Sequence, residues 1–150
     1  MPGEASLPVQ YYPDDFADLN LQFQAIQMPD PCVVFFAERS HVIDSVVLTT
    51  ITAQASHTIT LRISTDPTNV TATAVGVLDM GTAAGSRLYI STDEAPYTVS
   101  STGVVGTSAT SVRLNSNENT IPAGSYLILD PSAAVSWRGY IQIRLRSRLK

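Results

Sequence analysis

The sequence has little of the chemistry that cross-links a fold or charges its surface. Its single cysteine, Cys32, excludes an internal disulfide, so we expect stability to come from core packing or from association with other chains. Charged residues make up 15% of the chain, against about 25% in typical soluble domains, and the only lysine is Lys150. With a net charge of −4, the chain lacks the clustered basic residues that bind phosphates, so we expect no nucleic-acid partner.

Long apolar runs are missing as well. Apolar runs such as residues 32–37 and 46–48 are far below the roughly 20 residues that a membrane span requires, so we expect no membrane partner. The N-terminus, Met1 to Glu4, lacks the basic and then apolar pattern of a signal peptide, which indicates synthesis in the cytosol. The length of 150 residues allows one domain of ordinary size.

The first thirty residues differ from the rest in their proline content. Prolines at 2, 8, 13, 29 and 31 oppose a long helix or a central strand, so we interpret residues 1–30 as an extended N-terminal arm, with at most a short helical turn near Asp14–Asn20. An arm has too little surface of its own to bury its apolar side chains. We expect these side chains to anchor on another subunit, and the body of the same domain is the alternative anchor. They are Tyr11, Tyr12, Phe16, Leu19, Leu21 and Phe23.

From residue 31 onward, alternation of apolar and polar residues predicts β-strands that each bury one face. The clearest are residues 57–64, with Ile59, Leu61 and Ile63 inward, and 137–146, with Ile141, Ile143 and Leu145 inward. Turn residues separate about eight such segments, which is typical of a sandwich or barrel. The others are 32–38, 42–52, 87–92, 97–100, 110–115 and 126–130.

Two stretches give weaker signals. Residues 68–84 combine a possible helical stripe with β-branched residues and Gly76, so a loop, a short helix and an edge strand all stay open. Residues 103–106 are interpreted as a loop.

Candidate catalytic and metal-binding residues are few. His41 and His57 begin two neighbouring predicted strands and, with Asp44 or Glu38, would form a metal site if those strands paired, but their spacing is unspecific. Cys32 precedes an apolar run and is interpreted as a small core residue. Acidic pairs at 14–15 and 93–94 are interpreted as solvated turn charges. We therefore expect no catalytic residues, no metal, no cofactor and no enzymatic activity.

Trp137, followed by Arg138 and Tyr140, begins the last strand and suggests two roles. An exposed indole would form a platform for a sugar ring, and a buried one would pack in the core. Core packing is the commoner role for a tryptophan at a strand end.

The distribution of charge along the chain is uneven. Arg39 is the only arginine or lysine among the first 44 residues, whereas residues 138–150 contain no acid. The outward positions of the last strand therefore predict a basic outer face that suits a partner of opposite charge, or else the charged protection of a sheet edge. These positions are Arg138, Tyr140, Gln142, Arg144, Arg146 and Arg148.

The order of these segments resembles a known family. A proline-rich arm precedes CVVFFAERSHVIDSVVLTTITAQASHTITLRISTD, an Ala/Gly/Thr-rich middle follows, and the chain closes with IPAGSYLILDPSAAVSWRGYIQIRLRSRLK. Over residues 32–150 this pattern of hydrophobicity and turns is similar to the small jelly-roll proteins of tailed-bacteriophage virions, which include head decoration or cement proteins and related fibre and tail modules.

The resemblance implies an antiparallel, all-β jelly-roll sandwich over residues 31–150, with residues 1–30 as the arm. It also implies a homotrimer on the capsid exterior whose arms reach over the major capsid protein or neighbouring subunits. We therefore expect a non-enzymatic structural virion protein that is made in the host cytoplasm. A ligand- or glycan-binding module of a phage tail or fibre is the alternative.

Overall fold

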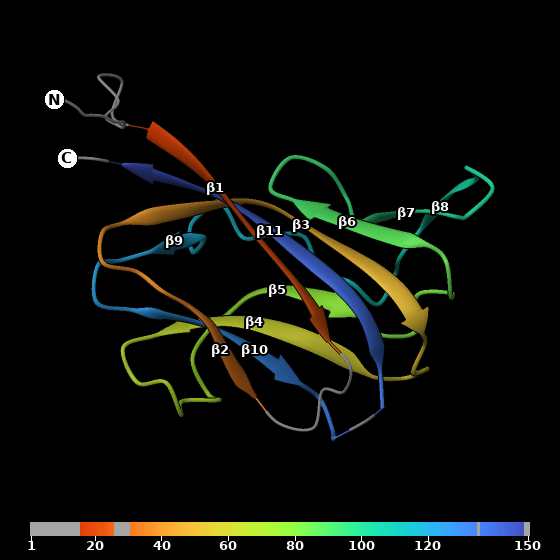
Figure 1. Ribbon diagram of the computed structural model, residues 1–150, viewed down its shortest axis with the longest axis horizontal. Helices are drawn as coiled ribbons and strands as arrows, with labels where there is room; N and C mark the ends of the chain where they lie inside the picture. The colour runs from red at the N-terminus through yellow and green to blue at the C-terminus, as the bar shows by residue number, and fades with distance from the viewer. Residues whose placement is uncertain (1–15, 26–30, 135, 149–150) are drawn as a thin grey trace, which may run out of the picture.

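The computed structural model describes residues 16–25, 31–134 and 136–148 as an antiparallel all-β structure (Figure 1). The described strands follow the alternating segments of the sequence, since alternation buries one face of each strand. They are β1 (Phe16–Ala25), β2 (Cys32–Phe36), β3 (His41–Thr52), β4 (Thr58–Ser64), β5 (Ala74–Asp79), β6 (Arg87–Ser91), β7 (Tyr97–Val99), β8 (Val105–Thr107), β9 (Thr120–Ile121), β10 (Tyr126–Pro131) and β11 (Arg138–Arg148). Within these residues no helix is long and apolar enough to cross a membrane.

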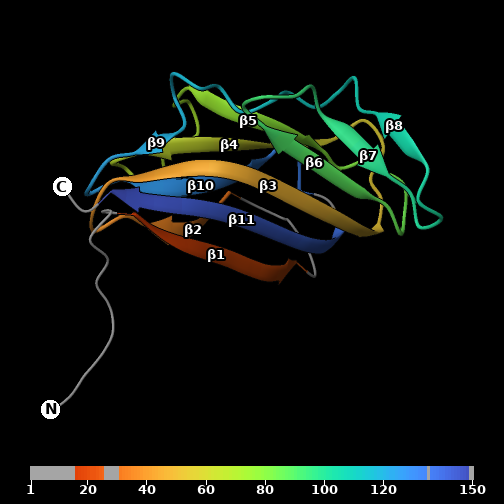
Figure 2. The same ribbon diagram turned by 90° about the horizontal axis from the view of Figure 1, so that it is seen from above.

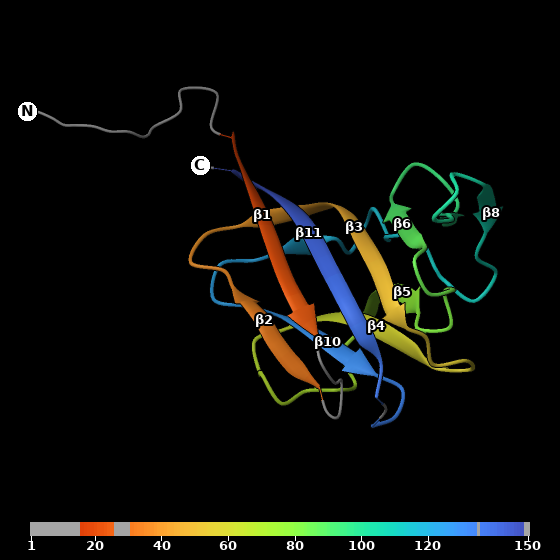
Figure 3. The same ribbon diagram turned by 45° about the vertical axis from the view of Figure 1, so that its right-hand side comes forward.

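Two sheets face each other, as the view in Figure 2 shows. The larger sheet has the order β1-β11-β3-β6-β7-β8, with the short β9 on β3, and the smaller sheet has the order β2-β10-β4-β5. Four antiparallel pairs are nested along the chain, from the outermost to the innermost: β1 with β11, β2 with β10, β3 with β6 and β4 with β5. The chain is therefore wound from the outer pairs inward. β7 and β8 extend the larger sheet at one side (Figure 1), and Figure 3 shows β8 at its border.

The core fills the space between the sheets with the inward residues of both. Leu61 on β4 and Ile141, Ile143 and Leu145 on β11 are fully buried, as the alternation predicts. Ile63 is only partly buried but packs against this core. The inward parity of the two clearest strands is confirmed.

Most of the predicted strands lie within one or two residues of the observed ones, but 110–115 is not a strand. The amide of Leu114 donates to the carbonyl of Ser91 in the larger sheet, and the amide of Asn115 donates to Val75 in the smaller sheet. The segment thus crosses from one sheet to the other, and its only strand-like pairing among the described residues is the bridge between Val112 and Val77.

Two ambiguous stretches are resolved. Residues 74–79 form β5 at the edge of the smaller sheet, which was one of the three options left open. Residues 105–107 form β8, so the interpretation of 103–106 as a loop is wrong for its second half. The backbone amides of Thr102 and Val104 donate hydrogen bonds to Oγ of Ser100, which closes the turn between β7 and β8 and allows this short pairing.

The segment assigned to the arm contains a strand of the larger sheet. β1 pairs with β11 over ten residues, from Phe16 opposite Arg148 to Ala25 opposite Gly139. The helical turn expected near Asp14–Asn20 is therefore wrong for residues 16–20, because backbone hydrogen bonds to β11 hold them extended. Residues 1–15 and 26–30 lie outside the described residues, and the division at residue 30 stays a prediction.

Candidate binding face on the larger sheet

The outer face of the larger sheet is built from two cross-strand rows of side chains. Residues that are directly opposite in paired strands project from the same face of a sheet. One row runs through Gln22, Gln142, Val47, Tyr89 and Tyr97. The next row runs through Gln24, Tyr140, Thr49, Arg87 and Val99. Strand register therefore brings together amide, phenol and guanidinium groups that are far apart in the sequence.

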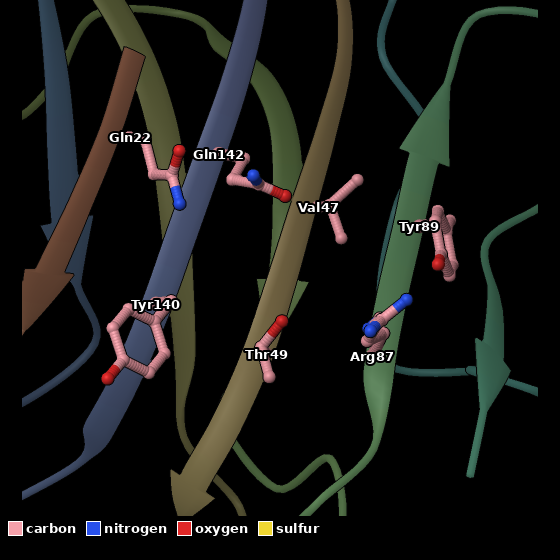
Figure 4. Close-up of a pocket in the computed structure, with 7 residues that line it drawn as sticks. All are labelled: Gln22, Val47, Thr49, Arg87, Tyr89, Tyr140 and Gln142. Atoms are coloured by element: carbon pink, nitrogen blue, oxygen red, sulfur yellow. The ribbon is translucent and has the colours of Figure 1, made fainter. Parts of the chain in front are cut away.

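These rows line an open hollow of about 500 Å³ (Figure 4). It crosses β1, β11, β3 and β6, a width of about 14 Å at the ~4.8 Å spacing of neighbouring strands. Tyr140, which lines the hollow from β11, is 40% exposed. Among the described residues that line the hollow, Arg87 is the only charged one, the others being Gln22, Val47, Thr49, Tyr89, Tyr140 and Gln142.

Tyr89 is held in place at one border of the hollow. Its ring stacks on that of Tyr97, with 4.9 Å between the centroids and 9° between the planes. Offset stacking of this kind stabilises both rings beyond the area that they bury. The position of Tyr89 is therefore fixed before any ligand arrives.

Arginines gather farther along β11, toward its C-terminal end. Nε and Nη2 of Arg146 donate to Oδ1 of Asp44 at 3.0 and 2.8 Å, while 45% of the arginine side chain stays exposed. Arg144 is exposed on the same face and also has interaction partners. Part of the basic character expected here is therefore balanced within the chain.

The expectation that these charges protect a sheet edge is wrong. β11 lies between β1 and β3, so its backbone groups are paired on both sides. Arg138, at the opposite end of the strand, is exposed and pairs in register with Thr52. The side chain of Arg148 lies outside the described residues, although its backbone pairs with Phe16.

The apolar residues assigned to the arm fall in several places. Leu21 packs against the core of its own domain, which is the alternative anchor considered above, and Leu19 is 39% exposed. Phe23 is in register with Ile141, but its side chain and that of Phe16 lie outside the described residues, as do Tyr11 and Tyr12. Subunit contacts by these residues stay a prediction.

The histidines do not form a metal site. His41 begins β3 of the larger sheet, where its Nδ1 lies 2.7 Å from the carbonyl oxygen of Arg39, and His57 precedes β4 of the smaller sheet. The strands do not pair, so the condition for the site fails. No group of three or more potential metal-ligating side chains exists in the described part of the chain.

Cys32 and Trp137 lie in opposite environments, and only the tryptophan lies in the core. Cys32 begins β2 at the edge of the smaller sheet and is exposed, so its assignment to the core is wrong, although neighbouring atoms desolvate the thiol and raise its pKa. Trp137 is fully buried in the core cluster. The sugar platform considered for Trp137 is therefore wrong, and its core role is confirmed.

Sequence reasoning did not find the β3 and β6 side of the hollow. The available signal was strand parity. The outward positions of the predicted strands include Val47, Thr49, Arg87 and Tyr89. Alternation gives the face of a residue but not the neighbouring strand, so these residues were not connected with Tyr140 and Gln142.

No protein-family model, no curated protein and no solved structure matches this chain.

Proposed function

We propose that the protein is a jelly-roll structural protein of a tailed-phage virion that decorates or cements the capsid exterior. The strand orders support the jelly roll: β1-β11-β3-β6 and β2-β10-β4-β5 are the two four-stranded sheets obtained when one long hairpin is rolled up. Double-sheet folds of this kind are common in viral capsid proteins. The likeness concerns the fold and not the binding sites. The function therefore needs support from the surface.

The pairing of β1 with β11 carries the proposal. It places residues 16–20 beside residues 144–148, so the arm enters the body next to the basic end of β11. In this register Phe16 lies opposite Arg148, whereas Leu19, Leu21 and Phe23 lie opposite the buried Leu145, Ile143 and Ile141 and so occupy positions on the opposite face. The docking surface that we propose therefore combines these arginines with the aromatic residues at or before the start of β1, which are Tyr11, Tyr12 and Phe16.

Arg146 is suited to docking because Asp44 fixes its orientation while leaving 45% of the side chain exposed. An oriented guanidinium loses less conformational freedom when it meets a carboxylate than a free one does. The partner is the major capsid protein, together with neighbouring copies of this chain in a homotrimer. Many weak contacts across a capsid lattice then add to strong attachment.

Binding to empty heads that lack this protein tests the proposal. We expect deletion of residues 1–15, or the double change Arg144→Glu and Arg146→Glu, to weaken attachment by about tenfold or more. Arg113→Glu is the matched control, since Arg113 is exposed but lies in the segment that crosses between the sheets. Both effects should be compared at low and high salt, where the contribution of the arginines should fall.

Wild-type attachment by both altered proteins would overturn the docking surface. Failure of the wild-type protein itself to bind heads would overturn the decoration role and favour the alternative, a ligand- or glycan-binding module of a tail or fibre. Sedimentation at micromolar concentration gives a separate check, because a stable monomer would contradict the homotrimer.

A further inference from the structure

We propose that the hollow over β1, β11, β3 and β6 is a binding site for an oligosaccharide that carries a carboxylate. The site lies on the same face as the arginines at the end of β11 but is lined by different residues. It does not depend on the capsid role and would serve a protein anchored on any virion surface.

The lining offers both kinds of contact that sugars need. Pyranose rings have apolar C–H faces that pack on aromatic rings, and Tyr140 and Tyr89 border the hollow. Their hydroxyls need planar donors and acceptors, which the amides of Gln22 and Gln142 supply from adjacent strands. Thr49 adds a hydroxyl between them and Arg87 (Figure 4).

The shape of the site also favours a saccharide chain. Pockets for small apolar ligands are enclosed and lined mainly by hydrophobic groups, whereas this hollow is open and Val47 is its only aliphatic residue among those described. A width of four strands allows linked sugar rings to lie across the sheet.

Arg87 determines the charge of the ligand. It is exposed, it makes no ion pair within the described part of the chain, and no described carboxylate lines the hollow with it. A guanidinium binds a carboxylate through two parallel hydrogen bonds, a geometry that a neutral sugar does not match. The site therefore complements a sugar acid such as a uronic or sialic acid.

Titration calorimetry and saturation-transfer NMR on the full chain test this site with matched probes. We expect 3′-sialyllactose or trigalacturonate to bind more tightly than its neutral counterpart, lactose or galactotriose, by about tenfold. Arg87→Gln should remove this preference while leaving weak binding of both members of a pair. Tyr140→Ala should weaken binding of acidic and neutral probes alike, by about three- to tenfold.

Three controls separate a site from a general loss of structure. Tyr140→Phe keeps the ring and should bind acidic and neutral probes more tightly than Tyr140→Ala does, and Arg113→Gln removes an exposed arginine elsewhere and should leave binding unchanged. Tyr126→Ala removes a tyrosine from the smaller sheet and should leave probe binding unchanged. Absence of binding by all four saccharides, equal binding of acidic and neutral probes, or unchanged binding by Arg87→Gln would each overturn the proposal.

Discussion

Gly139 lies directly against the indole ring of Trp137. A Cβ atom at residue 139 would lie 2.6 Å from both Cζ2 and Cη2 of that ring, and closer still to the carbonyl oxygen of Thr49. The register between β11 and β3 shifts at this point, between Arg138 and Gly139. The missing side chain thus lets the tryptophan enter the core where two central strands meet.

Gly139→Ala should therefore destabilise the fold by about 1–3 kcal/mol or more, because neither the buried ring nor the backbone of β3 has room to move. Gly106→Ala is the matched control, since its Cβ would meet only the hydroxyl of Thr98, which rotates away. Urea denaturation of both variants measures the difference. Equal stability of the two would contradict the close packing at Gly139.

A second prediction concerns the two faces of β11. Ile143→Asp would bury an unpaired carboxylate in the core and should abolish soluble folded protein. Gln142→Asp, on the exposed outer face one residue earlier, should change the free energy of unfolding by only about 0.5 kcal/mol. Circular dichroism and solubility distinguish these outcomes, and equal damage would mean that both faces are buried.

Thr60→Asp is not a suitable neutral control, although its outward parity suggests one. The register between β4 and β10 places Thr60 opposite Asp130, so a second carboxylate there would be repelled. We expect a measurable loss of stability that high salt reduces. A thermal melt at two salt concentrations checks this, and a melting temperature equal to that of the wild type would contradict the register.

Truncation separates the two parts of the predicted arm. Deleting residues 1–15 should leave the melting temperature unchanged, whereas deleting residues 1–28 should lower it by about 10 °C or more, because β1 and the packing of Leu21 are lost. If residues 1–30 were an arm outside the body, as the sequence was interpreted, the body would stay folded without residues 1–28. Identical melting of the two truncated proteins would restore that expectation.

Asn119 provides a test of loop anchoring. Its Nδ2 donates to the carbonyl of Ile43 at 2.9 Å, and its own carbonyl accepts from the amide of Ile43. Asn119→Ala should cost about 1–3 kcal/mol, because a buried carbonyl loses its donor. Asn117→Ala, at an exposed position two residues earlier, should have little effect in the same denaturation experiment.

The reactivity of Cys32 should depend on pH in a direction set by its pKa. Desolvation raises that pKa, so at a given pH near 8 the folded protein holds less thiolate than the unfolded one. Alkylation by iodoacetamide should therefore be slower in the folded protein and should increase at higher pH than for a free thiol. A pH–rate profile that coincides with that of the denatured chain would contradict the shift.

The sequence predicted strand faces well, because alternation is a local signal. Ile141, Ile143 and Leu145 face inward as expected. The neighbours of each strand were not predictable in this way, since pairing joins residues at opposite ends of the chain. The central position of β11 and the assembly of the hollow both depend on such pairing.

β1 was missed although its signal was present. Leu19, Leu21 and Phe23 alternate with polar residues, and no proline falls between Pro13 and Pro29. The flanking prolines dominated the interpretation of the whole segment. Pro13 and Pro29 lie outside β1 and are compatible with a ten-residue strand between them.

The pairing of the first described strand with the last has a consequence for synthesis on the ribosome. β11 lies inside the larger sheet, yet it is the last of the described strands to leave the exit tunnel. Until then, β1 and β3 both lack their shared neighbour, and their apolar faces stay exposed. Loop closure over such a distance is slow, so the nascent chain has to wait for β11 before it becomes resistant to aggregation and proteolysis.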